Sequence, residues 1–259
     1  MEHSARHTVI FTTILCVVFS LIVSAVSVAL KDRQVENKRL DKIKNVLAVA
    51  GLIQPGETLS REELSRRFET KLEPRLVDID AGTYVDVDDP MAYDQRKASS
   101  DAARSTVAPE NKAKVRRIPN HAQIFLLRED GEIEGIILPI EGYGLWSTLY
   151  GFVALAADAN TIRGITYYQH GETAGLGGEV DNPRWKALWP GRLVYGDSGE
   201  VAIRVKKGRA GPVDEDPYQV DGLSGATLTS NGVTNMLHFW LGENGFATYL
   251  DRYRQEKGI

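Results

Sequence analysis

The sequence predicts an α+β protein in which a single N-terminal transmembrane helix precedes a soluble domain with a mainly antiparallel sheet. Three observations support this fold class. Residues 8–30 are apolar and uncharged, a β-hairpin pattern begins after residue 120, and an apolar run over 233–241 follows a typical helix start. The chain has 259 residues, 42% of them hydrophobic, which allows one or two domains with a proper core.

The N-terminal apolar run is long enough to cross a bilayer. Its 23 residues, 8–30, contain no charged side chain and would extend about 34 Å as a helix. We therefore predict an uncleaved transmembrane helix. A secretory signal peptide is the alternative, because Ser27-Val28-Ala29 resembles a cleavage site. The apolar region of a signal peptide, however, usually has only roughly 7–15 residues. Cys16, the only cysteine, excludes an internal disulfide.

Three segments are expected. Residues 1–33 form the N-terminal tail and transmembrane helix, 34–119 a helical connector with a polar excursion, and 120–259 the main domain. Within the connector, Leu40, Ile43 and Leu47 share one helical face. A capping box predicts a second helix beginning after Ser60. The polar stretch 86–114 is expected to be an exposed excursion or a mobile loop.

The β pattern begins at residue 120. Apolar runs at 124–127 and 133–140 flank Asp130-Gly131, which is a hairpin signal. Further elements are expected as strands at 152–157, 162–168 and 201–205, and as a short helix at 183–188. Hairpins with few helices between them favour an antiparallel sheet.

Several classes of function are not supported by the composition. The formal charge of −4 leaves no basic excess, so nucleic acid is not expected as a partner. Histidines 3, 7, 121 and 238 are scattered, so no metal site is expected. No paired-carboxylate, Ser-His-Asp or Cys-His arrangement stands out. This pattern suits a protein that carries electrons rather than one that breaks bonds.

The most informative stretch is Asp221-Gly-Leu-Ser-Gly-Ala-Thr-Leu-Thr229, which runs into the apolar segment 233–241. Its small residues allow close approach of the backbone to a bulky group. Its hydroxyl residues indicate a helix start, where free N–H groups and the helix dipole favour a phosphate. The Thr229 hydroxyl would then be available for esterification. An ordinary capped turn before a core helix is the alternative.

This stretch resembles the flavinylation motif of the flavoproteins in the sodium-translocating NADH:quinone oxidoreductase and its Rnf relatives. The resemblance implies that Thr229 carries FMN through a phosphodiester bond. It also implies that a membrane-associated flavin transferase moves this FMN from FAD onto the hydroxyl. The recognition and pocket residues would be Asp221, Ser224, Gly225, Ala226 and Thr227.

A second motif, residues 170–179, contains four glycines after a predicted strand. It lacks the Lys-Ser/Thr ending of a nucleotide P-loop, and a surface turn is the alternative. It resembles the His-Gly-Glu-Thr-x-Gly-Leu-Gly loop that packs against the flavin in the same family. Ala174 stands where many relatives carry proline, and no catalytic role is assigned to His170. The positions that match are Glu172, Thr173, Gly175, Leu176 and Gly177.

A third motif, residues 142–147, resembles the Gly-x-Gly-Leu-Trp-Ser turn of the family. The resemblance implies that Leu145, Trp146 and Ser147 belong to the FMN site, where an aromatic wall would suit a flat ring. A core position for Trp146 is the alternative. Residues 89–96 resemble a segment typical of the C subunits of the sodium pump rather than their shorter Rnf counterparts.

The resemblance implies an electron carrier with covalent FMN in a complex that couples NADH oxidation by ubiquinone to sodium export. The FMN would pass electrons between a membrane iron centre and the flavin of the pump's B component. Expected partners are the A, B, D, E and F components of the pump, especially the membrane-embedded B, D and E, and the flavin transferase during maturation. No NADH site is expected on this chain. An Rnf-type protein, a non-redox periplasmic sensor and an anchored scaffold are the rivals.

The charges that flank the apolar run and the resemblance to the family predict opposite orientations in the membrane. Six basic residues between 31 and 44 follow the apolar run, and the positive-inside rule would place them in the cytoplasm. The family places the soluble domain in the periplasm. Large C-terminal domains can translocate regardless of flanking charge. We therefore expect a single-pass protein of the bacterial inner membrane with a periplasmic domain.

Overall fold

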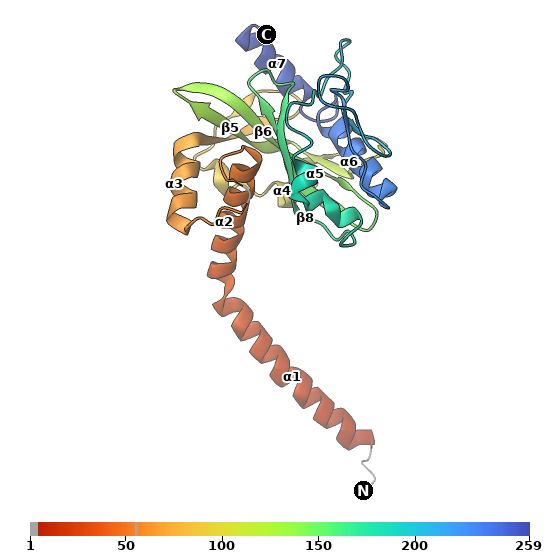
Figure 1. Ribbon diagram of the computed structural model, residues 1–259. Coiled ribbons are helices and arrows are strands. Elements are labelled where there is room, and N and C mark those ends of the chain that lie inside the picture. The colour runs from red at the N-terminus through yellow and green to blue at the C-terminus, as the bar shows by residue number, and fades with distance from the viewer. Residues whose placement is uncertain (1–4, 55) are drawn as a thin grey trace. The chain divides into compact units, whose positions relative to one another are not determined.

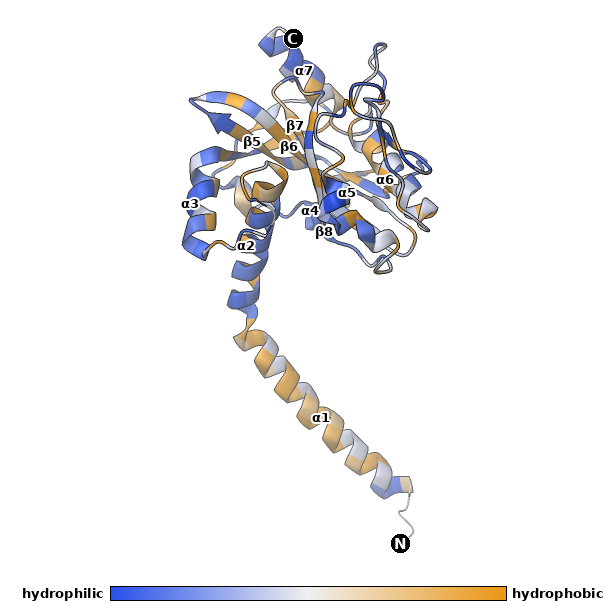
Figure 2. Ribbon diagram, viewed as in Figure 1, coloured by the Kyte–Doolittle hydropathy of each residue, from blue (hydrophilic) through white to orange (hydrophobic). Residues whose placement is uncertain are grey.

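The computed structural model describes residues 5–54 and 56–259 and divides the chain into two compact units, Met1–Lys42 and Ile43–Ile259 (Figure 1). The first unit holds α1 (Ala5–Ala29) and the start of α2 (Lys31–Val49). No residue of α1 is buried, and Figure 2 shows it as an almost continuous apolar helix. By length and composition, α1 can cross a membrane.

The second unit contains a sheet and the helices that cover it. After α2, the helices are α3 (Arg61–Lys71), α4 (Gln95–Ser100), α5 (Pro183–Lys186), α6 (Thr227–Trp240) and α7 (Ala247–Lys257), with 3-10 helices η1 (Pro90–Ala92) and η2 (Gly177–Asp181). The strands are β1 (Leu72–Asp78), β2 (Tyr84–Val85), β3 (Ser105–Val107), β4 (Arg117–Pro119), β5 (His121–Glu129), β6 (Glu132–Tyr143), β7 (Thr148–Ala156), β8 (Ile162–Gln169), β9 (Arg204–Val205) and β10 (Gln219–Val220).

The main sheet has six strands in the order β2-β1-β5-β6-β7-β8, and every neighbouring pair is antiparallel. The hairpin between β5 and β6 turns at Asp130 and Gly131, whose φ angles are 49° and 86°. Positive φ at both central residues is the geometry that matches the twist of the two strands. The predicted hairpin and the predicted α+β fold class are confirmed.

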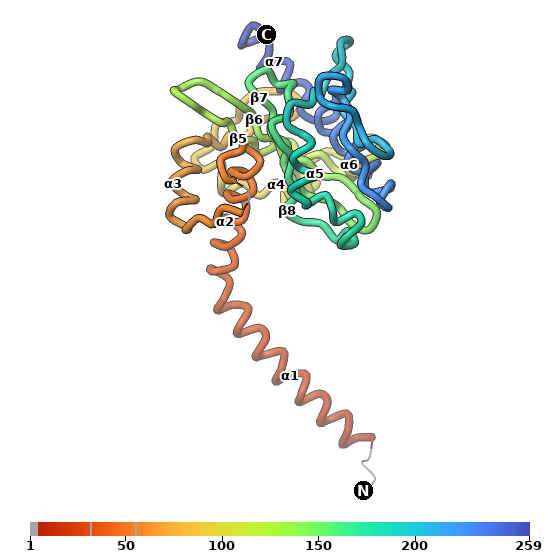
Figure 3. The backbone as a smooth tube through the Cα atoms, in the orientation of Figure 1, coloured from red at the N-terminus to blue at the C-terminus, as the bar shows by residue number. Residues whose placement is uncertain are grey.

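Both faces of the sheet are covered. Along β5, Ile124 and Leu126 join the core cluster that includes α6 and α7, whereas Phe125 and Leu127 join the cluster that includes α3 and the end of α2. Figures 1 and 3 show α6 and α7 on one side of the sheet and α3 on the other. Burial on both faces explains why the inner strands have continuous apolar runs rather than an alternating pattern.

The middle of the chain differs from the expected connector. Strand β1 pairs with β5 from Leu72↔Leu127 to Asp78↔His121, so part of the segment 34–119 belongs to the main sheet. The polar stretch 86–114 is ordered into η1, α4 and β3. Aspartates 89 and 94 cap the two helices through their side chains. Side-chain caps stabilise short polar helices that carry no apolar periodicity, which explains why the sequence pattern did not predict them.

Other local predictions hold in part. Ser60 caps α3 by accepting a hydrogen bond from the Glu63 N–H at 3.2 Å, and Asn182 caps α5. The strand expected over 201–205 is reduced to β9, which pairs in parallel with β10, and to a bridge between Tyr195 and Val201.

Candidate functional site

Three chain segments meet at the start of α6, and they are the three motifs that the sequence singled out. Thr229 lies in the first turn of α6, Glu172 lies in the loop that follows β8, and residues 144–147 connect β6 to β7. Direct hydrogen bonds join Thr229 to Glu172 and Glu172 to the 144–147 turn. The tertiary structure therefore brings the predicted site together around one hydroxyl.

The Thr229 side chain is completely buried. Its Oγ1 donates a hydrogen bond to Glu172 Oε2 at 2.6 Å. Gly177 lies against the same oxygen, since a Cβ added at Gly177 would come within 2.5 Å of Thr229 Oγ1. This packing requires glycine at position 177. The predicted acceptor hydroxyl is thus enclosed by the glycine-rich loop.

Glu172 is held by the backbone of the turn between β6 and β7. Its Oε1 accepts the N–H groups of Leu145, Trp146 and Ser147 at 3.2, 2.9 and 3.2 Å, and Oε2 also accepts the Leu145 N–H at 3.1 Å. Burial raises the pKa of this carboxyl, but the hydrogen bonds from Thr229 and the three N–H groups outweigh burial and bring the pKa below 4.5. Glu172 is therefore ionised at neutral pH.

A second set of contacts fixes the backbone on either side of Glu172. The Gly171 N–H donates to Ser147 Oγ at 2.6 Å, and the Glu172 N–H donates to His170 Nδ1 at 3.2 Å. His170 Nε2 lies 2.8 Å from Asp181 Oδ2, so Nε2 carries the proton in this arrangement. The role of Asp181 was not predicted, because no local pattern links it to His170.

The segments that meet at the buried hydroxyl carry four exposed apolar side chains. Leu145, Trp146, Leu176 and Leu228 are 37%, 65%, 43% and 58% exposed. We call these four residues the apolar rim. The core position considered for Trp146 is wrong, because its side chain faces solvent. Leu228 was not predicted as a site residue, although its place beside Thr229 on the first turn of α6 could have indicated it.

The remaining predicted residues of the flavinylation motif have different environments. Ser224, Gly225 and Thr227 are exposed, and Ala226 is buried at the N-cap of α6. Gly225 has a φ of 70°, and a Cβ there would lie 2.9 Å from Leu176 Cδ2, so the Leu176 side chain covers this turn. In the glycine-rich loop, Thr173 and Gly175 are exposed.

Asp221 supports a neighbouring loop. Its Oδ1 accepts the Ala210 N–H at 2.8 Å, and its carbonyl oxygen accepts the indole N–H of Trp185 at 2.9 Å. These contacts tie the start of the motif to the 206–211 segment and to α5. Asp221 therefore acts on the shape of the site, whereas the hydrogen bond of the Thr229 hydroxyl goes to Glu172.

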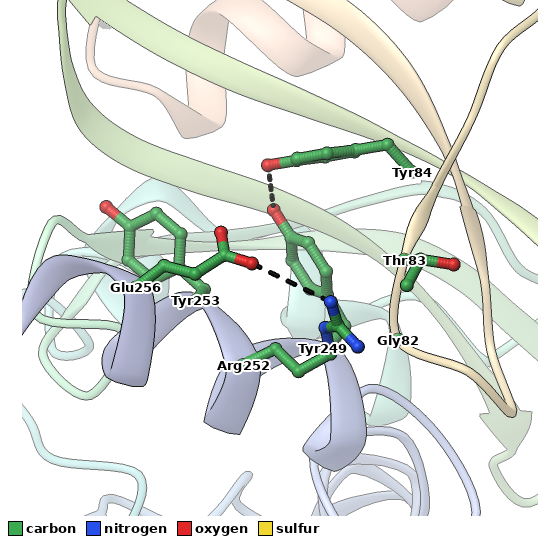
Figure 4. Close-up of a pocket in the computed structure, with 7 residues that line it drawn as sticks. All are labelled: Gly82, Thr83, Tyr84, Tyr249, Arg252, Tyr253 and Glu256. Carbon is green, nitrogen blue, oxygen red and sulfur yellow. Dashed lines mark hydrogen bonds and ion pairs between the residues drawn. The ribbon is translucent and has the colours of Figure 1, made fainter.

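A separate cavity of about 90 Å³ lies between α7 and the turn from β1 to β2 (Figure 4). Tyr84 and Tyr249 share a hydrogen bond of 3.0 Å there, beside Arg252 and Glu256. Its volume is below the roughly 300–1,000 Å³ typical of ligand sites. Among the described residues, no group of three or more His, Cys, Asp or Glu side chains could hold a metal ion.

The site geometry fits a large flat group attached at Thr229. The apolar rim offers a surface for a ring, and the first turn of α6 presents its positive end to a phosphate. FMN has this combination of a flat ring and a phosphate. The predicted FMN site is therefore compatible with the residues present.

Comparisons with known proteins agree with this assignment. The family model of the FMN-binding domain matches residues 144–242, which contain all three motifs apart from Gly142 and Tyr143. The chain is 46% identical to the C subunit of the Na(+)-translocating NADH-quinone reductase of Pseudomonas aeruginosa over 257 residues, covering 98% of both chains. It is 49% identical to the corresponding protein of Yersinia pestis, covering 97% of this chain and 94% of the other.

Two solved structures have the same fold. The crystal structure of Shewanella oneidensis NqrC matches with a TM-score of 0.78 and 33% identity, covering 85% of this chain and 99% of that chain. The C subunit of the same reductase from Parabacteroides distasonis matches with a TM-score of 0.67 and 26% identity, covering 85% and 96%. Both matches cover 85% of this chain, so the similarity is not limited to the motifs.

Proposed function

Because the chain belongs to the NqrC family, the C subunits of the Na(+)-translocating NADH-quinone reductases, we propose that it is a membrane-anchored electron carrier with FMN joined to Thr229 by a phosphodiester. The bound FMN supplies the redox chemistry. The protein holds the flavin, shields one side of it and sets its local electrostatics. The NADH site and the path of the sodium ion belong to other components of the complex.

One observation supports Thr229 as the attachment site. Thr229 is the hydroxyl on which all three motifs converge, and these motifs also carry the apolar rim of Leu145, Trp146, Leu176 and Leu228. Exposed apolar side chains that cluster at a site with buried polar groups are typical of ligand-binding surfaces. The rim would contact the isoalloxazine ring, and Ser224, Gly225 and Thr227 would lie beside the phosphate and ribityl chain.

A covalent link gives this protein two advantages. It fixes the flavin near its electron donor and acceptor, and it retains the flavin in a compartment where little free flavin would replace a lost one. We place the domain in the periplasm, anchored in the inner membrane by α1. The FMN would accept electrons from a membrane iron centre and pass them to the flavin of the pump's B component, with A, D, E and F completing the assembly.

The attachment is tested by in-gel flavin fluorescence of the denatured full chain, expressed with a flavin transferase that is active on a control flavoprotein. We expect a fluorescent band for the wild type and for Thr248→Val, which changes an exposed threonine on α7, and none for Thr229→Val. A band in Thr229→Val would move the attachment to another hydroxyl. No band in the wild type would favour a non-redox sensor domain.

Function in the complex needs a second measurement. Thr229→Val should abolish quinone reduction by the assembled complex, whereas Thr248→Val should retain it. Wild-type turnover in the Thr229 variant would assign the chain a scaffold role.

The orientation is tested separately by fusing alkaline phosphatase after Ile259. We expect activity of this reporter, which requires the periplasm. An inactive phosphatase fusion together with a fluorescent cytoplasmic reporter at the same position would reverse the orientation.

A further inference from the structure

We infer that Arg96 is a positioning residue of the flavin site, and that it acts from the face of the sheet opposite α6. It holds together the ends of β7 and β8, from which the turn 144–147 and the loop 170–177 extend. We call this turn and this loop the two walls of the site. The inference rests on the proposed function, and it gives a role to residues 89–96, which the attachment of FMN leaves without one.

Residues 89–96 are seated on the first half of β5. The Tyr93 hydroxyl donates a hydrogen bond to the His121 carbonyl oxygen at 2.7 Å. The backbone N–H of Gln123 donates to Gln95 Oε1 at 3.1 Å. These contacts fix the start of α4 on the sheet, so the side chain that follows them has a defined origin.

A row of three residues on neighbouring strands lies within reach of Arg96. Glu141 on β6 pairs with Tyr150 on β7, and Tyr150 pairs with Gln169 on β8. Directly paired residues of antiparallel strands point to the same face of the sheet. Tyr150 shares its face with Phe152, which belongs to the core cluster with α3 rather than to the one with α6. The row therefore lies on the face opposite α6.

Arg96 interacts with every member of this row. Its guanidinium carbon lies 3.9 Å from the ring centroid of Tyr150, and its Nη1 donates to Gln169 Oε1 at 2.7 Å. Burial raises the pKa of Glu141 to about 7, and the positive charge of Arg96 opposes that rise. A guanidinium suits this place because it is planar, so it can stack on an aromatic face and donate at its edge.

The row lies at the base of both walls, where the backbone ladder is interrupted. Tyr150 is the third residue of β7, which follows the turn 144–147, and Gln169 is the last residue of β8. The register between β7 and β8 shifts between Tyr150 and Gly151. A bulge of this kind disrupts the local ladder and bends the strand. Arg96 therefore bridges the two strands where their own pairing is incomplete.

The contacts between the walls depend on their spacing. The N–H groups of residues 145–147 donate to the Glu172 carboxylate, and the Gly171 N–H donates to Ser147 Oγ at 2.6 Å. Hydrogen bonds weaken when distance and angle depart from their narrow optimum. One wall carries Leu145 and Trp146 of the apolar rim and the other carries Leu176, so the same spacing sets the room for a ring.

The test is amide hydrogen exchange of the full unmodified chain in detergent, comparing Arg96→Ala with the wild type. Arg96 is exposed, so its replacement leaves the core intact. Loss of one hydrogen bond and one cation–π contact should raise exchange at the four N–H groups of residues 145–147 and Gly171 by about tenfold. Amides of α3 and α6 should keep their wild-type rates.

Lys97→Ala is the matched control on the same helix. The Lys97 side chain is 83% exposed, and its ammonium lies 3.4 Å from Asp94 Oδ2 within α4. We expect wild-type exchange at both walls in this variant. Faster exchange at the walls in Lys97→Ala, equal to that in Arg96→Ala, would overturn the specific role of Arg96.

A double variant tests whether Arg96 acts through β8. Gln169→Met removes the acceptor on that strand and keeps a side chain of similar length. Since the two residues share one hydrogen bond, Arg96→Ala combined with Gln169→Met should raise exchange by less than the product of the two single effects. Effects that multiply would overturn the link through Gln169.

The attached flavin gives an independent readout. Arg96→Ala labelled with FMN should show shifted absorption bands relative to the labelled wild type, because the walls that contact the ring have moved. Labelled Lys97→Ala should give the wild-type spectrum. A wild-type spectrum in Arg96→Ala would overturn the effect of Arg96 on the flavin site.

The remaining failures are distinguishable. Faster exchange confined to residues 89–101 would reduce Arg96 to a local contact of α4, and faster exchange spread equally over α3 and α6 would indicate a general loss of stability; either overturns the positioning role. A wild type that an active transferase fails to label overturns the proposed function instead. The exchange rates of the unmodified chain still decide whether Arg96 holds the two walls.

Discussion

Gly177→Ala directly probes the packing around the Thr229 hydroxyl. The added Cβ would lie 2.5 Å from Thr229 Oγ1 and 2.8 Å from Glu172 Oε2. Side chains rarely approach a Cβ closer than 3.0 Å, so Oγ1 would have to shift by about 0.5 Å. The shift is opposed by the first turn of α6 on one side and by the three N–H groups that hold Glu172 on the other.

The expected cost follows from these contacts. Overpacking a well-packed site costs about 1–3 kcal/mol, and weakening the Thr229–Glu172 hydrogen bond adds about 1 kcal/mol. For a unit the size of Ile43–Ile259, each kcal/mol lowers the melting temperature by about 2–4 °C. We therefore expect the melting temperature of unmodified Gly177→Ala to fall by roughly 5–15 °C.

The assay is thermal unfolding of the full unlabelled chain in detergent, followed by circular dichroism. Gly175→Ala is the matched control in the same loop. Its φ of 75° makes alanine unfavourable by about 1–2 kcal/mol, but a Cβ there meets nothing within 4 Å. We expect a smaller loss than for Gly177→Ala. Equal melting temperatures for the two variants would refute the close packing of Gly177 against Thr229.

Three further predictions follow from the same contacts. Because the folded pKa of Glu172 lies below 4.5, the stability that its ionised form contributes is complete above that pH and is lost as the pH falls through the lower folded pKa. In a series of melting temperatures from about pH 7 to 3, Glu172→Gln should therefore lose less stability on acidification than the wild type. Parallel plots of melting temperature against pH for the two proteins would contradict this. Trp146→Ala should change stability by less than about 0.5 kcal/mol, because the side chain is 65% exposed, yet alter the absorption spectrum of the attached flavin; an unchanged spectrum would remove Trp146 from the ring contact. Asp221→Ala should free the Ala210 N–H and speed limited proteolysis after the basic residues of 206–211, and wild-type cleavage rates would show that Asp221 does not hold that loop.

The sequence predicted much of the fold because many elements are encoded locally. The β5–β6 hairpin follows from Asp130-Gly131 between two apolar runs, and the α3 start follows from the Ser60 cap. The ordered stretch over 86–114 was not predicted. Its helices depend on the caps of Asp89 and Asp94 and on packing such as the buried Ala98, rather than on an apolar pattern.

The candidate site was likewise predicted in part from the sequence and in part required the structure. The identities of Thr229, Glu172 and Trp146 as site residues came from short motifs and the family they resemble. Their roles depended on the fold, which exposes Trp146 and buries Thr229. Asp181 and Leu228 entered only with the structure, because a contact to His170 or a place on the apolar rim has no local signature.

The sequence by itself determined the apolar helix, the antiparallel hairpins and the motifs that identify the family, because these depend on residues that are neighbours in the chain. The tertiary structure alone decided that the Thr229 hydroxyl is buried and donates to Glu172, which lies 57 positions earlier. That contact exists because α6 packs on β6 while the loop after β8 folds over its first turn. Long-range packing thus pairs one hydroxyl of a short motif with one carboxylate.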